Sequence, residues 1–458
     1  MKPTRRNFLA GAAALPFMPK LALANETPQL IAADAKHQIA PDAYPKTEVW
    51  CFNDQVPGSL IRVRQGQKVE RRFINLLPQA SSVHWHGIRL DNAMDGVPGL
   101  TQDLVQPGGS FDYGFETPDA GTYWYHSHNR SLEQVERGLY GPLIVDEPER
   151  PDVDHDEVIV LDDWLFDQQA QIIGDFNAMH SLSHGGRLGN YLSAMTPGRK
   201  SLTFRQNDRV RLRLINAATD KIFSLGVHGF DGKVVALDGM PLEDPTPLDH
   251  LVLGPAQRAD IIADVVAEDG SIATLVSHER SSAMLLAELS IVGKSSRSTR
   301  EAITALPPNP IKKIQSLNEA STASLLMEGG AMGRLQAGVY KGEQLSIRQL
   351  VENGQVWTFN GVANITDEPL AEVGLGEVLR IPITNQTAFP HAMHLHGHHF
   401  QEIRPDGRFG PFRDTLLINR NETREIAFQA TNPGSWLFHC HMLSHQKAGM
   451  KTFIKVFA

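Results

Sequence analysis

Closely spaced histidines are the residues of this chain whose types and spacing are best suited to chemistry. Nineteen histidines occur in the sequence, and ten of them lie in four short segments that each contain a His-x-His pair. These ten are His84, His86, His126, His128, His391, His394, His396, His439, His441 and His445. Because residues i and i+2 of a β-strand point to the same face, each pair directs two imidazoles to one side. Eight paired imidazoles are too many for one metal ion and predict a cluster of two or three, while leaving copper, zinc, iron and nickel open.

Cys440 decides among those metals. It lies in the middle of the last His-x-His pair, so its side chain points to the opposite face of the same strand. Met450 follows closely, and His391 and His445 are the two clustered histidines outside the four pairs. One cysteine, two histidines and one methionine form the ligand set of a blue-copper electron-transfer centre, in which methionine is the weak axial ligand. A structural zinc site would normally take more thiolates or a closed set of cysteines and histidines, and would not use the methionine.

The same alternation connects the two predicted centres. The sulfur of Cys440 is one residue of backbone away from the histidine on either side, which gives an electron a short covalent route. A mononuclear acceptor joined in this way to a cluster suits a reaction that takes electrons singly and delivers four to O₂. Cys440 is therefore expected to be catalytic as well as metal-binding. Cys51, in the apolar run 49–52, is expected to be a buried, inert thiol.

Short strands are the elements that must position these residues. Residues 210–214 alternate apolar and polar with period two, as a half-buried strand does. Glycine and proline interrupt the sequence often, for example at 106–109 and 432–434, and long helical periodicity is scarce. The chain is therefore predicted to be all-β, built from mostly antiparallel sandwiches or barrels.

Internal repeats divide the chain into three. Residues 69–75, 210–216 and 379–385 share one pattern, an apolar residue followed six positions later by asparagine, with an apolar strand between. Residues 114–128 also match residues 427–441 without a gap, and Ser127 takes the place of Cys440. These repeats predict three related β domains, of which only the first and last carry His-x-His pairs, so the metal cluster is expected between those two.

The predicted boundaries follow from these repeats. Domains are expected at residues 27–148, 153–293 and 341–458, joined between the second and third by a connector at 294–340 that is rich in serine, proline and glycine. Residues 1–24 resemble a twin-arginine signal peptide: Arg5-Arg6 precedes a short apolar run, and Ala22-Leu23-Ala24 ends it. This pattern predicts export by the twin-arginine machinery to the periplasm or beyond, the alternative being a cytoplasmic protein with a chance Arg-Arg pair.

The bulk composition excludes some partners. A net charge of −9 argues against nucleic acid or an anionic membrane surface, since both require basic patches. The apolar run near the N-terminus is too short to remain as a membrane span, and no later segment is long and apolar enough to form one.

The histidine segments resemble a known family. The sequences HWHG (84–87), HSH (126–128), HAMHLHGHH (391–399) and HCHMLSHQKAGM (439–450) are similar to the four copper-binding motifs of multicopper oxidases. That group includes laccases, the bacterial copper-efflux oxidase and bilirubin oxidase. The resemblance implies three cupredoxin-like, Greek-key β-sandwich domains, with O₂ and a small reductant as substrates.

The resemblance also implies four copper ions. Their ligands would be His391, Cys440, His445 and Met450 for the type 1 copper; His84 and His394 for the type 2 copper; and His86, His126, His128, His396, His439 and His441 for the type 3 pair.

Proton supply is the next property that the resemblance addresses. Asp95 matches a family carboxylate that supplies protons beside the cluster, the alternative being a turn aspartate before Gly96 and Pro98. In many bacterial members a glutamate directly follows the second type 1 histidine, but here Gln446 stands there and cannot act as an acid.

The reductant is the least determined feature. Met327 and Met332 suggest soft-metal binding, although packing roles are preferred for both. Ile365 and Thr366 replace the Asp and Met that the copper-efflux oxidase has after its Asn-Gly turn. A laccase-like oxidation of phenolic or aromatic compounds is therefore favoured, with Cu(I) oxidation for copper tolerance and a non-catalytic copper carrier as alternatives. His180 and His184 are expected to be solvated, the alternative being substrate contact.

Overall fold

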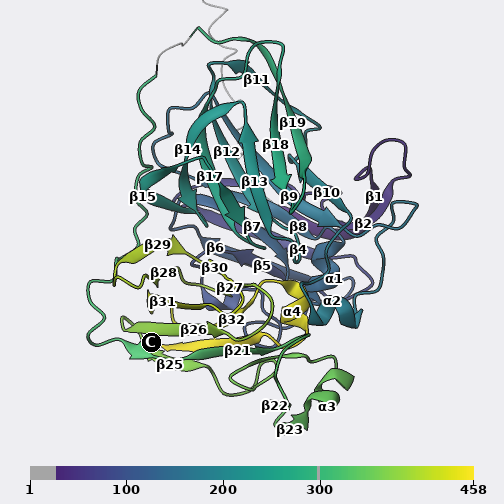
Figure 1. Cartoon of the computed structure of the whole chain (residues 1–458), viewed down its shortest axis with the longest axis vertical. Coiled ribbons are helices and arrows are strands. Elements are labelled where there is room, and N and C mark those ends of the chain that lie inside the picture. The colour runs from purple at the N-terminus through teal and green to yellow at the C-terminus, as the bar shows by residue number, and fades with distance from the viewer. Residues whose placement is uncertain (1–26, 297–299) are drawn as a thin grey trace, which may run out of the picture.

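Strands dominate the computed structural model, which describes residues 27–296 and 300–458 (Figure 1). The predicted signal peptide lies outside the described residues. Four short α-helices occur in the described part of the chain: α1 (Ser131–Glu136), α2 (Met179–Ser183), α3 (Ile347–Glu352) and α4 (Leu443–Lys447). The prediction of an all-β chain of cupredoxin-like domains is confirmed. None of the helices in the described residues is long and apolar enough to cross a membrane.

The first part of the chain forms two four-stranded sheets. One has the order β2-β1-β4-β6 and the other β3-β8-β7-β5. Their strands are β1 (Gln29–His37), β2 (Thr47–Phe52), β3 (Ile61–Arg64), β4 (Lys68–Asn75), β5 (Val83–His86), β6 (Ser110–Glu116), β7 (Gly121–Ser127) and β8 (Tyr140–Asp146). The rings of Trp85 on β5 and Phe115 on β6 lie 4.8 Å apart, so the two sheets pack face to face over an aromatic core.

The middle part forms a six-stranded sheet, β10-β9-β12-β17-β14-β15, and a five-stranded sheet, β11-β19-β18-β13-β16. The strands are β9 (His155–Trp164), β10 (Tyr191–Met195), β11 (Leu202–Gln206), β12 (Arg209–Asn216), β13 (Phe223–His228), β14 (Phe230–Leu237), β15 (Met240–Pro247), β16 (Leu251–Leu253), β17 (Arg258–Val265), β18 (Ile272–His278) and β19 (Ala283–Lys294). Their inward residues form a separate apolar cluster, as expected for an independent sandwich.

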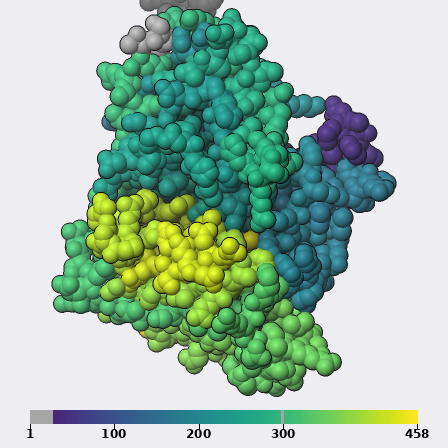
Figure 2. All heavy atoms as spheres, viewed as in Figure 1, coloured from purple at the N-terminus to yellow at the C-terminus, as the bar shows by residue number. Residues whose placement is uncertain are grey.

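The last part again has two sheets, one with the path β24-β21-β26-β31-β28-β29 and one with the order β25-β33-β32-β27-β30. The strands are β20 (Ser321–Thr322), β21 (Leu325–Gly329), β24 (Trp357–Phe359), β25 (Ala371–Gly374), β26 (Val378–Asn385), β27 (His391–Leu395), β28 (Phe400–Ile403), β29 (Phe409–Arg413), β30 (Thr415–Ile418), β31 (Thr423–Gln429), β32 (Gly434–Cys440) and β33 (Lys451–Phe457), with the hairpin β22 (Ala337–Tyr340) and β23 (Glu343–Ser346) beside them. Figure 2 shows the C-terminal residues, in yellow, packed directly against the teal residues of the middle part.

The segment 294–340, expected to be a connector, contains regular structure. Both β20 and β21 pair with β26 in parallel. Leu325 and Met327 alternate with less buried neighbours on β21 and are both fully buried. Their period-two pattern is only five residues long, which makes it hard to distinguish from a loop in sequence.

The three repeated segments are the same strand in each part of the chain, namely β4, β12 and β26. Each strand ends in a buried asparagine: Asn75, Asn216 and Asn385. The Nδ2 atoms of these residues donate to backbone carbonyls 2.8–2.9 Å away in the loops that follow, four or five residues further along the chain. The repeated asparagine therefore satisfies buried loop carbonyls at equivalent places in the three sandwiches.

Candidate metal centres

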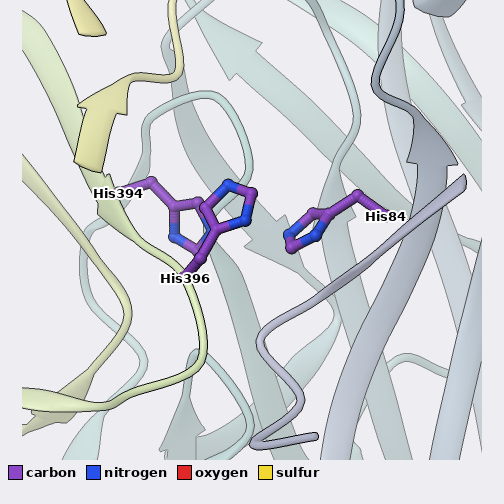
Figure 3. A group of neighbouring side chains, drawn as sticks. All are labelled: His84, His394 and His396. Carbon is purple, nitrogen blue, oxygen red and sulfur yellow. The ribbon is translucent and has the colours of Figure 1, made fainter. Parts of the chain in front are cut away.

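Two antiparallel strand pairs position the eight paired histidines. In the first, β5 and β7, His84 lies opposite His126. In the second, β27 and β32, His394 lies opposite His439. The two strand pairs face each other, because the rings of His84 and His396 stack with centroids 3.9 Å apart. Figure 3 shows His84 pointing toward His394 and His396 from the opposite side of the site.

The ring nitrogens converge on a small volume. The Nε2 atoms of His396 and His439 are 3.1 Å apart, and those of His126 and His441 are 3.4 Å apart. His128 joins His396 and His439 in a group whose ligand atoms all lie within 4.8 Å of one another. The first and last parts of the chain therefore supply one shared cluster, and the described residues of the middle part supply none of these eight imidazoles.

These nitrogens fit metal ions better than any alternative partner. The Nε2 atoms of His84, His128 and His394 are buried and have no hydrogen-bond partner. Such an atom costs about 1–3 kcal/mol when nothing replaces its water. Burial first, and then the neighbouring imidazoles, hold the pKa values of His128 and His396 well below the usual one. The rings are therefore neutral, which is the form that binds metals.

Backbone carbonyls fix which nitrogen faces the cluster in four of the rings. Four Nδ1 atoms lie 2.9–3.0 Å from a carbonyl oxygen, in the pairs His84–Asp95, His126–Ser127, His394–Asp414 and His439–Cys440. A carbonyl can only accept, so Nδ1 carries the hydrogen and Nε2 is left with its lone pair. This arrangement is typical of metal-binding histidines, whose second nitrogen is held by the protein.

Asp95 contacts ligand rings from both ends of the chain. It lies directly after the short 3₁₀-helix η2 (Asn92–Met94) and is 1 % exposed. One carboxylate oxygen is 2.9 Å from Nδ1 of His396, and the other is 3.2 Å from Nδ1 of His84. Gly96 permits this position, because a Cβ there would lie 1.9 Å from the Val83 carbonyl oxygen on β5. Asp95 thus lies in a turn and also contacts two rings of the cluster.

Asp414 is a buried carboxylate that the sequence did not reveal. It lies between β29 and β30, and its Oδ1 is 3.2 Å from Nε2 of His86. Arg258, on β17, donates two hydrogen bonds to this carboxylate, of 2.9 and 2.6 Å. Although burial favours the neutral acid, Arg258 and His86 hold the pKa of Asp414 well below its usual range. The middle part of the chain therefore supports the cluster through a guanidinium.

The second centre lies on the other face of β32. The Sγ atom of Cys440 is 3.6 Å from Nδ1 of His391 and 3.9 Å from Nδ1 of His445, and these two nitrogens are 3.0 Å apart. Met450 is fully buried, and its carbonyl accepts from the Cys440 backbone N–H at 3.1 Å. Burial raises the pKa of the Cys440 thiol, a penalty that a bound cation would remove. The site has the donors of a blue-copper centre.

The remaining residues singled out in the sequence belong to neither group of metal-ligand side chains. Met327 is fully buried on β21, whereas Met332 is 77 % exposed. Cys51 is buried in β2, and burial raises the pKa of its thiol to about 11, as expected for an inert cysteine. Gln446 lies 3.2 Å from Nδ1 of His439 and lines a cavity of about 470 Å³ that also reaches His128.

Comparisons with known proteins agree with this geometry. Residues 34–150, 156–283 and 339–456 each match a family described as multicopper oxidase. The chain is 32% identical to "Multicopper oxidase MmcO" of Mycobacterium tuberculosis, over 89% of this chain and 83% of that protein. It is 29% identical to "Laccase-1" of Botryotinia fuckeliana, over 87% of this chain and 77% of that protein.

Solved structures are similar as well. The structure of Lac15 from a marine microbial metagenome is 44% identical, with a TM-score of 0.78, and the match covers 94% of this chain and 100% of that one. A multi-copper oxidase from Pseudomonas thermotolerans is 33% identical, with a TM-score of 0.79, over 94% of this chain and 98% of that one.

Proposed function

The chain belongs to the multicopper oxidase family, and from this premise we propose that it oxidises small phenolic and other aromatic reductants in a laccase-like reaction. Membership makes it a copper-dependent oxidoreductase that uses O₂ as electron acceptor. The observation that carries the proposal is strand β32, which directs the Cys440 thiol toward one centre and the flanking imidazoles toward the other.

The proposed ligand sets follow the two faces of that strand. His391, Cys440, His445 and Met450 would hold the type 1 copper; His84 and His394 the type 2 copper; and His86, His126, His128, His396, His439 and His441 the type 3 pair. When bound, copper accepts and passes on single electrons, which none of these side chains does by itself. The protein contributes buried imidazoles, four of which have their tautomer fixed by a backbone carbonyl.

Protons must also reach the buried cluster, since O₂ takes up four electrons and four protons to form two water molecules. We assign proton delivery to Asp95, whose two oxygens contact two ligand rings. Gln446 cannot act as a general acid, so the cavity that it lines would supply water rather than an acid. The same cavity reaches His128 and would admit O₂.

Export remains part of the proposal. Arg5-Arg6, the apolar run after it and Ala22-Leu23-Ala24 support passage through the twin-arginine machinery to the periplasm or beyond. Detection of mature protein beginning after Ala24 in the periplasmic fraction, and its loss in an Arg5→Lys/Arg6→Lys variant, would test this.

A second candidate reductant is Cu(I). Met332 supports it, because its thioether is largely exposed and the preceding Ala331 N–H donates to the Ser183 carbonyl of α2 at 2.7 Å. A relative that is 25% identical carries the name "Copper resistance protein A homolog". Met327 offers a matched control, since it is buried and cannot meet a dissolved ion without unfolding.

Oxygen uptake distinguishes these functions. The copper-loaded protein should consume O₂ with guaiacol as reductant, at one O₂ for every four electrons and without peroxide release. If uptake with Cu(I) is much faster and falls in Met332→Leu but not in Met327→Leu, the Cu(I) function replaces the phenolic one. A protein that binds copper and consumes no O₂ with either reductant would be a carrier, and the proposal would be wrong.

A further inference from the structure

The imidazoles of the Cys440 centre cannot touch a reductant directly. His391 and His445 are both 0% exposed. Their Nδ1 atoms face the thiol, so the opposite nitrogens, Nε2, point away from the centre. An incoming electron must therefore cross whatever group lies against these Nε2 atoms.

Two different groups lie there. Nε2 of His391 is 2.8 Å from the hydroxyl oxygen of Thr387, and Thr387 is itself 1 % exposed. Nε2 of His445 donates to the backbone carbonyl of His184 at 2.7 Å. His184 is only half-buried. Only the second contact leads to a residue that reaches solvent, because Thr387 is buried and His184 is not fully buried.

The His184 ring is held in place at the surface. Its Nδ1 lies 3.0 Å from the Ser183 hydroxyl and 3.1 Å from the His180 carbonyl. The rings of His180 and His184 are 4.1 Å apart, and the Phe389 ring is 5.8 Å from that of His184. Three ring systems thus gather where the α2 segment covers the Cys440 centre.

The α2 segment is also fastened to the centre that it covers. The indole N–H of Trp357 donates to the Leu182 carbonyl at 2.6 Å, and the Trp357 ring lies 4.5 Å from that of His445. The position of His184 relative to His445 is therefore fixed by two separate hydrogen bonds.

We propose that an aromatic reductant binds against His180, His184 and Phe389, and that its electron reaches His445 through the His184 carbonyl. This inference rests on the proposed function. The phenol loses one electron and releases its hydroxyl proton to water, leaving as a phenoxyl radical. The electron passes to the Cys440 centre, and four such events supply the electrons for one O₂.

The His180, His184 and Phe389 rings favour an aromatic molecule over an aliphatic one. Stacked and edge-on ring contacts each change binding by about two- to tenfold beyond simple burial. His184 is half-buried, and the contact of its backbone carbonyl with His445 does not depend on its side chain. Replacing the ring should therefore weaken binding while leaving the Cys440 centre intact.

Guaiacol and its methyl ether, veratrole, provide the test, because veratrole has the same shape but no phenolic proton. We compare wild type with His184→Ala, His184→Phe and the control His228→Ala, an exposed histidine on β13. The veratrole Kd, measured by NMR titration of the copper-loaded protein, should rise about fivefold in His184→Ala, from loss of one ring contact. It should change less than twofold in His184→Phe and His228→Ala. The guaiacol KM should follow the same order.

The outcomes separate this inference from the proposed function. If wild type oxidises guaiacol but His184→Ala and His228→Ala have the same veratrole Kd and guaiacol KM, the aromatic surface is elsewhere and the inference is wrong. If wild type neither oxidises guaiacol nor binds veratrole, the phenolic function itself fails. An altered visible spectrum in His184→Ala would show that the ring supports the centre rather than the reductant, and would also overturn the inference.

Discussion

Replacing Asp95 by asparagine should separate the two halves of the reaction. The substitution keeps the shape of the side chain but exchanges one accepting oxygen for an N–H₂ group. In the structure one oxygen accepts from the Nδ1–H of His396 at 2.9 Å. The other lies 3.2 Å from Nδ1 of His84, whose N–H donates to the Asp95 backbone carbonyl at 2.9 Å. In the variant the amide N–H₂ group must face one of these two Nδ1–H groups, so either the hydrogen bond to His396 is lost or a donor is placed against His84.

The size of the effect follows from these contacts. Loss of a group that orients a metal ligand typically costs about 10- to 100-fold in activity or metal affinity. If Asp95 also delivers protons, general acid catalysis adds a further factor of about 10² or more. We expect oxidation of the reduced protein by O₂ to slow at least about 100-fold. Reduction of the Cys440 centre should change less than twofold, because Asp95 contacts only rings of the other centre.

Stopped-flow spectroscopy measures the two half-reactions separately. Bleaching of the thiolate–copper band by guaiacol without O₂ gives the first rate, and its return on mixing with O₂ gives the second. Asp91→Asn is the control, since Asp91 is exposed in the same turn. Unchanged rates in both half-reactions would remove Asp95 from the mechanism, and equal slowing of both would refute the separation of the two faces of β32.

Three further predictions follow from the buried groups. Asp414→Asn should destabilise the copper-free protein by about 1.5–3 kcal/mol in urea unfolding, because the buried Arg258 guanidinium loses its charge-assisted hydrogen bonds to this carboxylate and keeps only Asp238, at 3.7 Å; a change below 1 kcal/mol would contradict the pairing. Gln446→Glu adds a carboxyl group beside His439, so the pH profile of O₂ reduction should gain a limb near about pH 4.3, and an identical profile would exclude this contact from proton transfer. Burial lowers the pKa values of His445 and His399 to about 4, so between about pH 6.5 and 4 the unfolded copper-free chain binds protons that the folded chain does not. The free energy of unfolding of the copper-free protein should therefore fall on acidification by about 1.4 kcal/mol per pH unit for each such histidine. A free energy of unfolding that does not change with pH would show that these rings take up protons as readily in the folded chain as in the unfolded one.

The sequence was sufficient for the parts of the site that strands create. Alternation places His439 and Cys440 on opposite faces, and the repeat that ends in asparagine identifies β4, β12 and β26 as equivalent. Both signals are local, because period two follows from the geometry of a single strand. For the same reason the overall all-β class could be predicted without knowledge of tertiary contacts.

Contacts between distant segments could not be predicted. Asp414 and Arg258 are 156 residues apart, and neither lies in a motif that distinguishes it from other charged residues. His184 seemed solvated in sequence, yet its carbonyl lies against His445, 261 residues away. Such contacts depend on how the three sandwiches pack against one another, and a local sequence pattern does not predict that packing. The β21 strand was missed for a different reason, since its alternating segment is short.

Metal analysis combined with visible absorption tests the central claim most directly. The copper-loaded wild type should hold four copper ions per chain and show an intense blue thiolate band. Cys440→Ala should lose that band and one copper ion while the histidine cluster keeps three, and Cys51→Ala should retain both properties. A blue band that survives in Cys440→Ala, or a wild-type protein that holds a single copper ion, would contradict the two-centre arrangement on β32.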